Sequence, residues 1–159
     1  MASDPVAPEP PPIRSARAAD LPAILRIERA SFTVPWTDRA FRAVMARPDA
    51  ALLVADAEGR VAGYAALWLE GRDAELGDLA VARDRRRSGL GRRLVEAAVE
   101  EAAGRGAERI FLQVRESNEA ALALYRSTGF RRIGRKRGYY RTPREDALVL
   151  IRETGAGAR

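Results

Sequence analysis

The sequence predicts an α/β fold in which one mixed β-sheet is covered by helices. Short apolar runs with strand character alternate with amphipathic segments of helical period, in the order β-α-α-β-β-β-α-β-α-β-β. Three strands within residues 51–81 are separated only by short turns, which predicts an antiparallel meander. One helix, over residues 92–103, joins two strands and forms the single parallel crossover.

The first third of the chain predicts one strand and two helices. Residues 13–18 form a short apolar strand. Asp20 is a good N-cap for a helix that runs to about residue 30. Thr37 or Asp38 caps a second helix that runs to about residue 46.

The rest of the chain alternates strands and helices. Strands are expected at residues 51–55, 61–69, 74–81, 109–115, 130–136 and 147–152. Leu90, Leu94 and Ala98 recur every four residues, so one stripe of their helix faces the sheet. A last helix begins at residues 117–119 and ends at Gly129, which suits a C-terminal cap. Residues 138–140 are expected to join the two closing strands.

The 159 residues predict one domain, over residues 13–152. Residues 1–12 contain five prolines and are expected to be a disordered tail. Residues 153–159 are expected to be a flexible C-terminal tail. No apolar run reaches the ~20 residues that span a bilayer, and no secretory pattern is present, so we expect a cytoplasmic protein without a membrane partner.

The chain has no cysteine, no histidine and a net charge of +6. These absences exclude thiolate chemistry and remove the commonest metal ligand and general base, so no metal is expected. A base must then be a carboxylate, a tyrosine, an amine or water. The positive charge suits an anionic partner such as a polyphosphate cofactor or nucleic acid, although it also suits a GC-rich genome.

The stretch Arg83–Gly91 links a predicted strand to the N-terminus of a predicted helix and contains Arg86-x-x-Gly89-x-Gly91. Helix N-termini offer unpaired N–H groups and a positive dipole end, and glycines let the backbone approach a phosphate. The stretch therefore predicts a pyrophosphate cradle, with a plain capping turn as the alternative.

Several separated pieces of the chain resemble the GCN5-related N-acetyltransferase (GNAT) family. Within that family they are most similar to the bacterial RimI type, which acetylates the N-terminal alanine of a small-subunit ribosomal protein. The matching pieces are Leu79-Ala80-Val81 with Arg86–Arg92, Ile27-Glu28-x-x-Ser31-Phe32-x-x-Pro35-Trp36, Val114-Arg115-x-Ser117-Asn118-x-x-Ala121-x-x-Leu124-Tyr125, Gly129-Phe130, and Tyr139-Tyr140 with Glu145-Asp146-Ala147.

The resemblance implies a GNAT fold whose central strand pair is splayed, with acetyl-CoA as co-substrate in the gap. A backbone N–H near Leu79 would polarise the thioester carbonyl. Asn118 would hydrogen-bond the cofactor arm, and Tyr125 would donate a proton, or a hydrogen bond, to the departing thiolate. The alternative for Tyr125 is a core-edge tyrosine with a locally satisfied hydroxyl. The cofactor-binding residues implied are Leu79, Ala80, Val81, Arg86, Arg87, Ser88, Gly89, Leu90, Gly91, Arg92, Asn118 and Ala121.

The chain departs from the family pattern at Gln113, where RimI-type enzymes carry the glutamate that resembles their base. Glutamine cannot take up the proton. Glu75 could replace that base, with Asp78 and Glu116 as weaker candidates. Alternatively little base is needed, since an α-amine has a pKa of about 7.7–8.0, and Gln113 orients the amine or a water. A third reading is an impaired protein or a different acceptor.

The resemblance also places three aromatic residues beside the acceptor groove. Trp36, Tyr139 and Tyr140 would bind the first residues of the substrate, or else anchor their loops. The basic run 131–137 either attracts a partner or is a solvated, charged strand edge.

The sequence thus predicts an acetyl-CoA-dependent N-terminal acetyltransferase acting on a protein that begins with alanine, most simply a ribosomal protein. One alternative is a GNAT enzyme that acetylates lysine or a small-molecule amine. A second alternative is a non-catalytic basic module that binds RNA or the ribosome; it leaves the Arg86–Gly91 turn and Tyr125 unexplained, and direct nucleic-acid binding is not expected.

Overall fold

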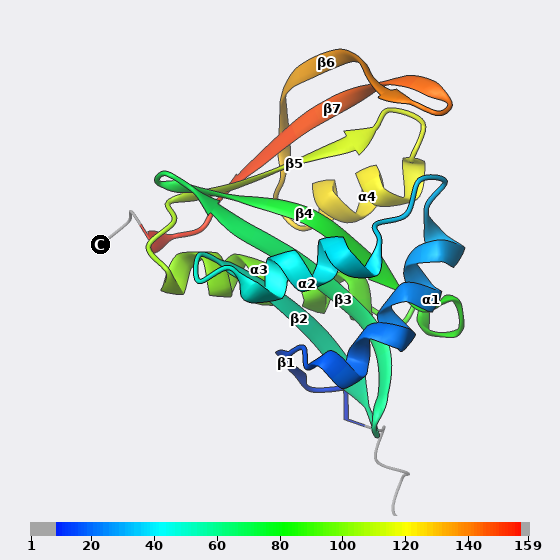
Figure 1. Cartoon of the computed structure of the whole chain (residues 1–159). Helices are drawn as coiled ribbons and strands as arrows, with labels where there is room; N and C mark the ends of the chain where they lie inside the picture. The colour runs from blue at the N-terminus through cyan, green and yellow to red at the C-terminus, as the bar shows by residue number, and fades with distance from the viewer. Residues whose placement is uncertain (1–8, 157–159) are drawn as a thin grey trace, which may run out of the picture.

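A computed structural model describes residues 9–156 and contains one seven-stranded sheet (Figure 1). The strands lie in the order β1-β2-β3-β4-β5-β7-β6, and every neighbouring pair is antiparallel except β4 and β5. The expected fold class and single parallel crossover are therefore confirmed. The strands are β1 Ile13–Ser15, β2 Ala50–Ala57, β3 Arg60–Glu70, β4 Asp73–Val81, β5 Arg109–Arg115, β6 Arg131–Arg141 and β7 Arg144–Glu153.

Four α-helices cover the two faces of this sheet. They are α1 Leu21–Ser31, α2 Asp38–Ala46, α3 Leu90–Gly104 and α4 Glu119–Ser127, with short 3-10 turns η1 Ala18–Asp20 and η2 Arg83–Arg85. Helices α1 and α2 share a core with one set of strand side chains, which includes Leu52 and Val54. Helices α3 and α4 share a core with the alternating set, which includes Leu53. None of the helices within residues 9–156 is long and apolar enough to cross a membrane.

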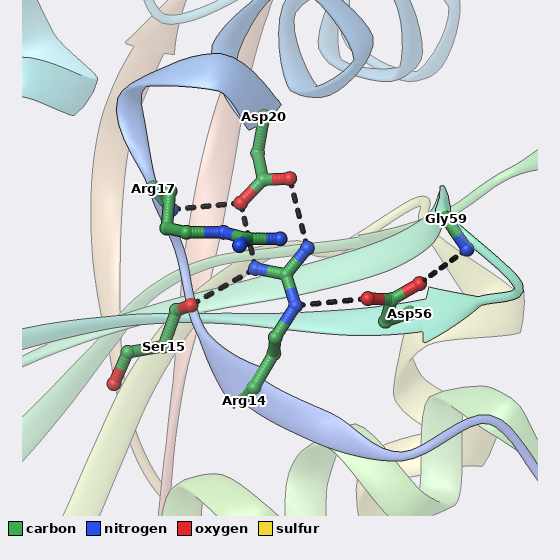
Figure 2. A network of polar contacts seen from close by, with 6 residues as sticks. All are labelled: Arg14, Ser15, Arg17, Asp20, Asp56 and Gly59. Atoms are coloured by element: carbon green, nitrogen blue, oxygen red, sulfur yellow. Dashed lines mark hydrogen bonds and ion pairs between the residues drawn. The ribbon is translucent and has the colours of Figure 1, made fainter.

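The entry into α1 differs from a simple capped helix start. Asp20 occupies the N-cap position, but its carboxylate makes no cap bond and accepts instead from the Arg17 N–H at 2.7 Å. The Arg14 guanidinium bonds both Asp20 and Asp56, which in turn accepts from the Gly59 N–H in the β2–β3 turn (Figure 2). This network fixes β1 and the start of α1 to the first hairpin. The expected cap by Thr37 on α2 is present, with a 3.2 Å bond from the Ala40 N–H.

Strands β4 and β5 separate soon after they pair. Their parallel register covers only three residue pairs and ends at Glu75 opposite Phe111 (Figure 1). Two residues further on, the register of β4 with β3 steps past Gly77, which has no partner. Because a bulge reverses which face the following side chains take, Glu75 and Asp78 both point towards α1 and α2. The splay and the bulge open the sheet at its centre.

The closing hairpin differs from the sequence prediction. Tyr139 and Tyr140 do not lie in a connecting loop, because β6 continues to Arg141. The register instead steps between Lys136 and Tyr140, where Gly138 takes a φ of +59°. The Asp146 carboxylate accepts from the Gly138 N–H at 2.8 Å and holds this irregular stretch inside the strand.

The two ends of the described chain are hydrogen-bonded to the domain. The Pro12 carbonyl accepts from the Asp56 N–H, and the Thr154 N–H donates to the Glu108 carbonyl. Glu153 is the last residue of β7. The remainder of the expected tails, residues 1–8 and 157–159, lies outside the described residues.

Candidate active site

The splay between β4 and β5 contains a pocket of about 220 Å³. It is lined by the bulge of β4, by β5, by the segment between α1 and α2, and by the inner side of α4. The predicted site residues that it brings together are Trp36, Leu79, Gln113, Asn118, Ala121, Tyr125 and Tyr140. A larger hollow of about 860 Å³ lies beside residues 10–12 and Arg93, but none of these seven residues lines it.

The turn after β4 presents free backbone donors. Gly89 has a φ of +82° and Arg87 a φ of +63°, so the chain turns sharply into α3. Among residues 9–156 no acceptor is found for the N–H groups of residues 87–92. Six consecutive free amides at the positive end of a helix dipole can receive an anion.

The side chains in and next to this turn make different contacts. Arg86 donates to the Val81 carbonyl at 3.2 Å and to the Ser31 hydroxyl at 3.3 Å, so it ties the turn to α1. Arg92 donates to the Ser127 carbonyl at the end of α4. The Ser88 hydroxyl donates to a carbonyl within the turn. The exposed Arg87 side chain has no such bond within the described chain, so it can approach a bound anion.

Asn118 and Tyr125 come from the start and the inner face of α4. The Asn118 carboxamide oxygen accepts from the Ala121 N–H at 3.1 Å and caps the helix. Tyr125 is buried against Phe130, and burial raises the pKa of its hydroxyl. That hydroxyl has no hydrogen-bond partner among the described residues, which argues against a locally satisfied core tyrosine.

Glu75 and Gln113 meet on the face of the sheet that α1 and α2 cover. The Gln113 amide nitrogen donates to one Glu75 oxygen at 3.2 Å, and the Trp68 indole N–H donates to the other at 3.1 Å. Burial raises the pKa of Glu75. Gln113 lines the pocket, whereas Glu75 stands behind it. The two predicted residues thus form one hydrogen-bonded unit.

The aromatic candidates contribute unequally to the pocket. Trp36 stacks on Trp68 at 6.0 Å between ring centroids, and both belong to the core under α1 and α2. Tyr140 lines the pocket, with the Arg115 guanidinium 4.3 Å from its ring centre, and burial raises its pKa to about 12. Tyr139 is half exposed and packs against Tyr140 without lining the pocket itself.

A buried acidic pair lines the pocket: Asp78, a weaker base candidate from the sequence, and Glu28, to which the sequence assigned no role. Glu28 is 1% exposed and accepts from the Tyr64 hydroxyl at 2.6 Å and from the Trp36 N–H at 2.9 Å. The Asp78 carboxyl lies against it. The sequence carried a signal for Glu28, because it falls on the same helical stripe as Leu21 and Ile24.

Glu116, a weaker base candidate, lies elsewhere. Its exposed carboxylate binds Arg135 through two hydrogen bonds of 2.6 and 2.8 Å, and this contact lowers its pKa. It does not line the pocket. No cluster of three or more metal-ligating side chains occurs in the part of the chain that the structure describes.

This site has the features of an acyltransferase that binds coenzyme A. It combines a splayed parallel strand pair, a helix N-terminus with free amides and a buried tyrosine. The sequence matches the acetyltransferase (GNAT) family over residues 21–130, and the chain belongs to that family. GNAT enzymes use acetyl-CoA. The chain is an N-acetyltransferase of the RimI type.

Its relatives match this chain along nearly their whole length. The chain is 36% identical over 140 residues to the [ribosomal protein bS18]-alanine N-acetyltransferase of Escherichia coli K12, covering 87% of this chain and 94% of the relative. It is 35% identical over 153 residues to N-alpha-acetyltransferase RimI of Mycobacterium tuberculosis, covering 92% and 95%. The crystal structure of the E. coli ribosomal-protein-S18-alanine N-acetyltransferase superimposes with a TM-score of 0.81 at 34% identity, over 90% of this chain and 93% of that chain.

Proposed function

We propose that this protein transfers the acetyl group of acetyl-CoA to the α-amine of a protein that begins with alanine, and that this protein is a small-subunit ribosomal protein in the cytoplasm. The observation that carries the proposal is the pocket in the splay, where Tyr125 and Gln113 line one cavity. The name of the E. coli relative supports this acceptor, and the name of the M. tuberculosis relative supports transfer to an α-amine.

The free amides of residues 87–92 fit the pyrophosphate of coenzyme A. Arg87 adds charge to this cradle, while Arg86 and Arg92 hold the turn against α1 and α4. Past the end of their register, the edges that Leu79–Val81 and β5 turn towards each other lack a strand partner and offer bonds to the pantetheine arm. The free side of Asn118 offers another. Acetyl-CoA supplies a thioester, whose carbonyl carbon accepts the nucleophile.

In the reaction the amine nitrogen bonds to the thioester carbon and the carbon–sulfur bond breaks. The proton that leaves the nitrogen passes to a water, and another passes from the Tyr125 hydroxyl to the sulfur; the tyrosinate then regains a proton from water. Tyr125 fits the donor to sulfur, because its raised pKa keeps the hydroxyl protonated over the working range. Gln113 orients the amine, and Glu75 fixes the direction of the Gln113 amide. The amine enters in its neutral form, whose fraction is substantial near pH 7.5.

A pH series separates this role of Glu75 from general-base catalysis. In Glu75→Gln the acidic limb of the pH profile of kcat/KM for an Ala-starting peptide should be unchanged, because the pKa of the substrate amine sets it. The rate should fall roughly tenfold, because the Gln113 amide is no longer held in one orientation. Disappearance of the acidic limb would instead identify Glu75 as the base. Gln113→Glu should raise the rate below pH 7, because the new carboxylate can take the proton.

The acceptor class is tested with a matched peptide panel. Peptides that begin with alanine, serine or methionine are compared with an N-terminally blocked peptide whose only amine is lysine. Thiol release and peptide mass should show α-acetylation of the Ala-starting peptide. Faster acetylation of the blocked lysine peptide would show that the protein is a lysine acetyltransferase. Failure to bind acetyl-CoA in calorimetry would refute the enzyme and favour the basic binding module.

A further inference from the structure

Two buried side-chain oxygens in the described chain lack any hydrogen-bond partner, and both belong to residues that line the pocket. They are Asp78 Oδ2 and Gln113 Oε1. Buried polar groups in folded proteins are almost always paired, so unpaired acceptors that share one cavity indicate a ligand with donors.

The direction of the Gln113 oxygen is fixed by its neighbour. A carboxylate can only accept, so the amide nitrogen must be the atom that faces Glu75. The Trp68 N–H holds the other oxygen of Glu75 and keeps this carboxylate in place. The Gln113 oxygen is therefore turned away from Glu75 and left without a donor.

Asp78 is 8% exposed and follows the bulge at Gly77, which turns it towards α1. Burial first, and then contact with Glu28, raises the pKa of Asp78 to about 10. The Asp78 carboxyl therefore keeps its proton and donates it in a hydrogen bond to Glu28, which also accepts from Tyr64 and Trp36. Tyr64 and Trp36 donate to Glu28, and the Leu79 N–H lies near the Asp78 carboxyl, but no donor of the described chain bonds Asp78 Oδ2.

The chemistry of the two oxygens selects the ligand. A carboxylate or a phosphate brings no donor, and a hydroxyl brings one. A neutral primary amine, like the water that it would displace, brings two donors, and it keeps its lone pair for the thioester carbon. The negative charge of the acidic pair also favours the positive charge that develops on the attacking nitrogen.

We propose that Asp78 and Gln113 form the subsite that binds the α-amine of the acceptor, each accepting one of its N–H groups. This inference rests on the proposed function and adds Asp78, with Glu28 behind it, to the residues that position the nucleophile. It also predicts selectivity for primary over secondary amines, because an N-methylated terminus leaves one oxygen unpaired.

The test measures binding rather than turnover. Calorimetry on the protein loaded with coenzyme A compares an Ala-starting hexapeptide with its desamino analogue, in which a propanoyl group replaces alanine. The wild-type protein should bind the amine roughly 10- to 100-fold more tightly. In Asp78→Leu and in Gln113→Leu this ratio should fall to within a few-fold of one. Asp78→Asn should keep most of the ratio, since its nitrogen donates to Glu28 and its oxygen faces the pocket.

Two readouts keep the interpretation clear. Unchanged affinity for coenzyme A shows that each variant is folded. If Asp78→Leu does not fold, the comparison with Gln113→Leu still tests the subsite. A wild-type protein that acetylates the peptide yet binds both analogues equally would overturn the subsite and leave the proposed function standing. A wild-type protein that neither binds nor acetylates the peptide would overturn the proposed function. Retention of the full ratio in both Leu variants would also refute the subsite.

Discussion

Gly77 can be tested by adding a single methyl group to the bulge of β4. In Gly77→Ala the new Cβ would lie 2.0 Å from the Cη2 atom of the Trp68 ring, where ordinary contacts begin near 3.4 Å. The ring must therefore retreat by roughly 1.4 Å. It cannot do so freely, because it stacks on Trp36 and its N–H holds Glu75.

Overpacking of this kind costs about 1–3 kcal/mol. For a domain of this size each kcal/mol lowers Tm by about 2–4 °C, so we expect Gly77→Ala to melt about 2–12 °C below the wild type. The displaced indole also releases Glu75, so kcat/KM for the peptide should fall while the affinity for coenzyme A stays unchanged.

A control and a rescue separate this clash from a general intolerance of alanine. Gly134, in β6, has nothing within 4 Å of its potential Cβ, so Gly134→Ala should leave Tm nearly unchanged. Shortening the ring in Gly77→Ala/Trp68→Leu should recover part of the lost stability relative to the sum of the single changes. A Gly77→Ala protein as stable as the wild type, or strict additivity in the double variant, would refute the reasoning.

Three further changes test other parts of the structure. Tyr64→Phe removes a buried bond to the Glu28 carboxylate, and urea titration should show a loss of about 1.5–3 kcal/mol; a loss below about 0.5 kcal/mol would contradict the buried network. Arg14→Met removes the group that lowers the pKa of its two aspartate partners. Carboxyls with a lowered folded pKa stabilise the protein above their unfolded pKa of about 3.9, and this contribution is lost as pH falls through the folded value. The stability difference between Arg14→Met and the wild type should therefore be largest at pH 5–7 and shrink below pH 4. A difference that is constant with pH would show that Arg14 contributes to stability through packing and not through its charge. Tyr125→Phe should lower kcat by about 10²–10⁴-fold with little change in the KM for acetyl-CoA, and an unchanged kcat would remove Tyr125 from proton donation.

The order of elements was predictable because its signals are local. Helical and strand periods, the Thr37 cap and the terminating Gly129 depend on neighbours in the sequence. The prediction was wrong at Tyr139 and Tyr140, because an aspartate on the partner strand holds the glycine before them inside β6. A cross-strand bond of this kind has no local signature.

The catalytic face was only partly predictable. The motif predicted Tyr125, Gln113 and the turn before α3 as parts of the site, and Glu75 was predicted as a replacement base. The Gln113–Glu75 contact depends on two strands that lie side by side only through the crossover. Trp68 carried no signal of its own, since its role arises from the absence of a side chain at Gly77.

The sequence by itself determined the fold, the family and the position of the Arg83–Gly91 turn, because these follow from short-range patterns and a motif of fixed spacing. The tertiary structure alone decided which polar groups meet in the pocket. A one-residue bulge in β4 turns Asp78 towards Glu28 on α1, and the loss of pairing after Glu75 opens the space between the strands. The direction of a side chain depends on register, and register is set by strands that are distant in the sequence.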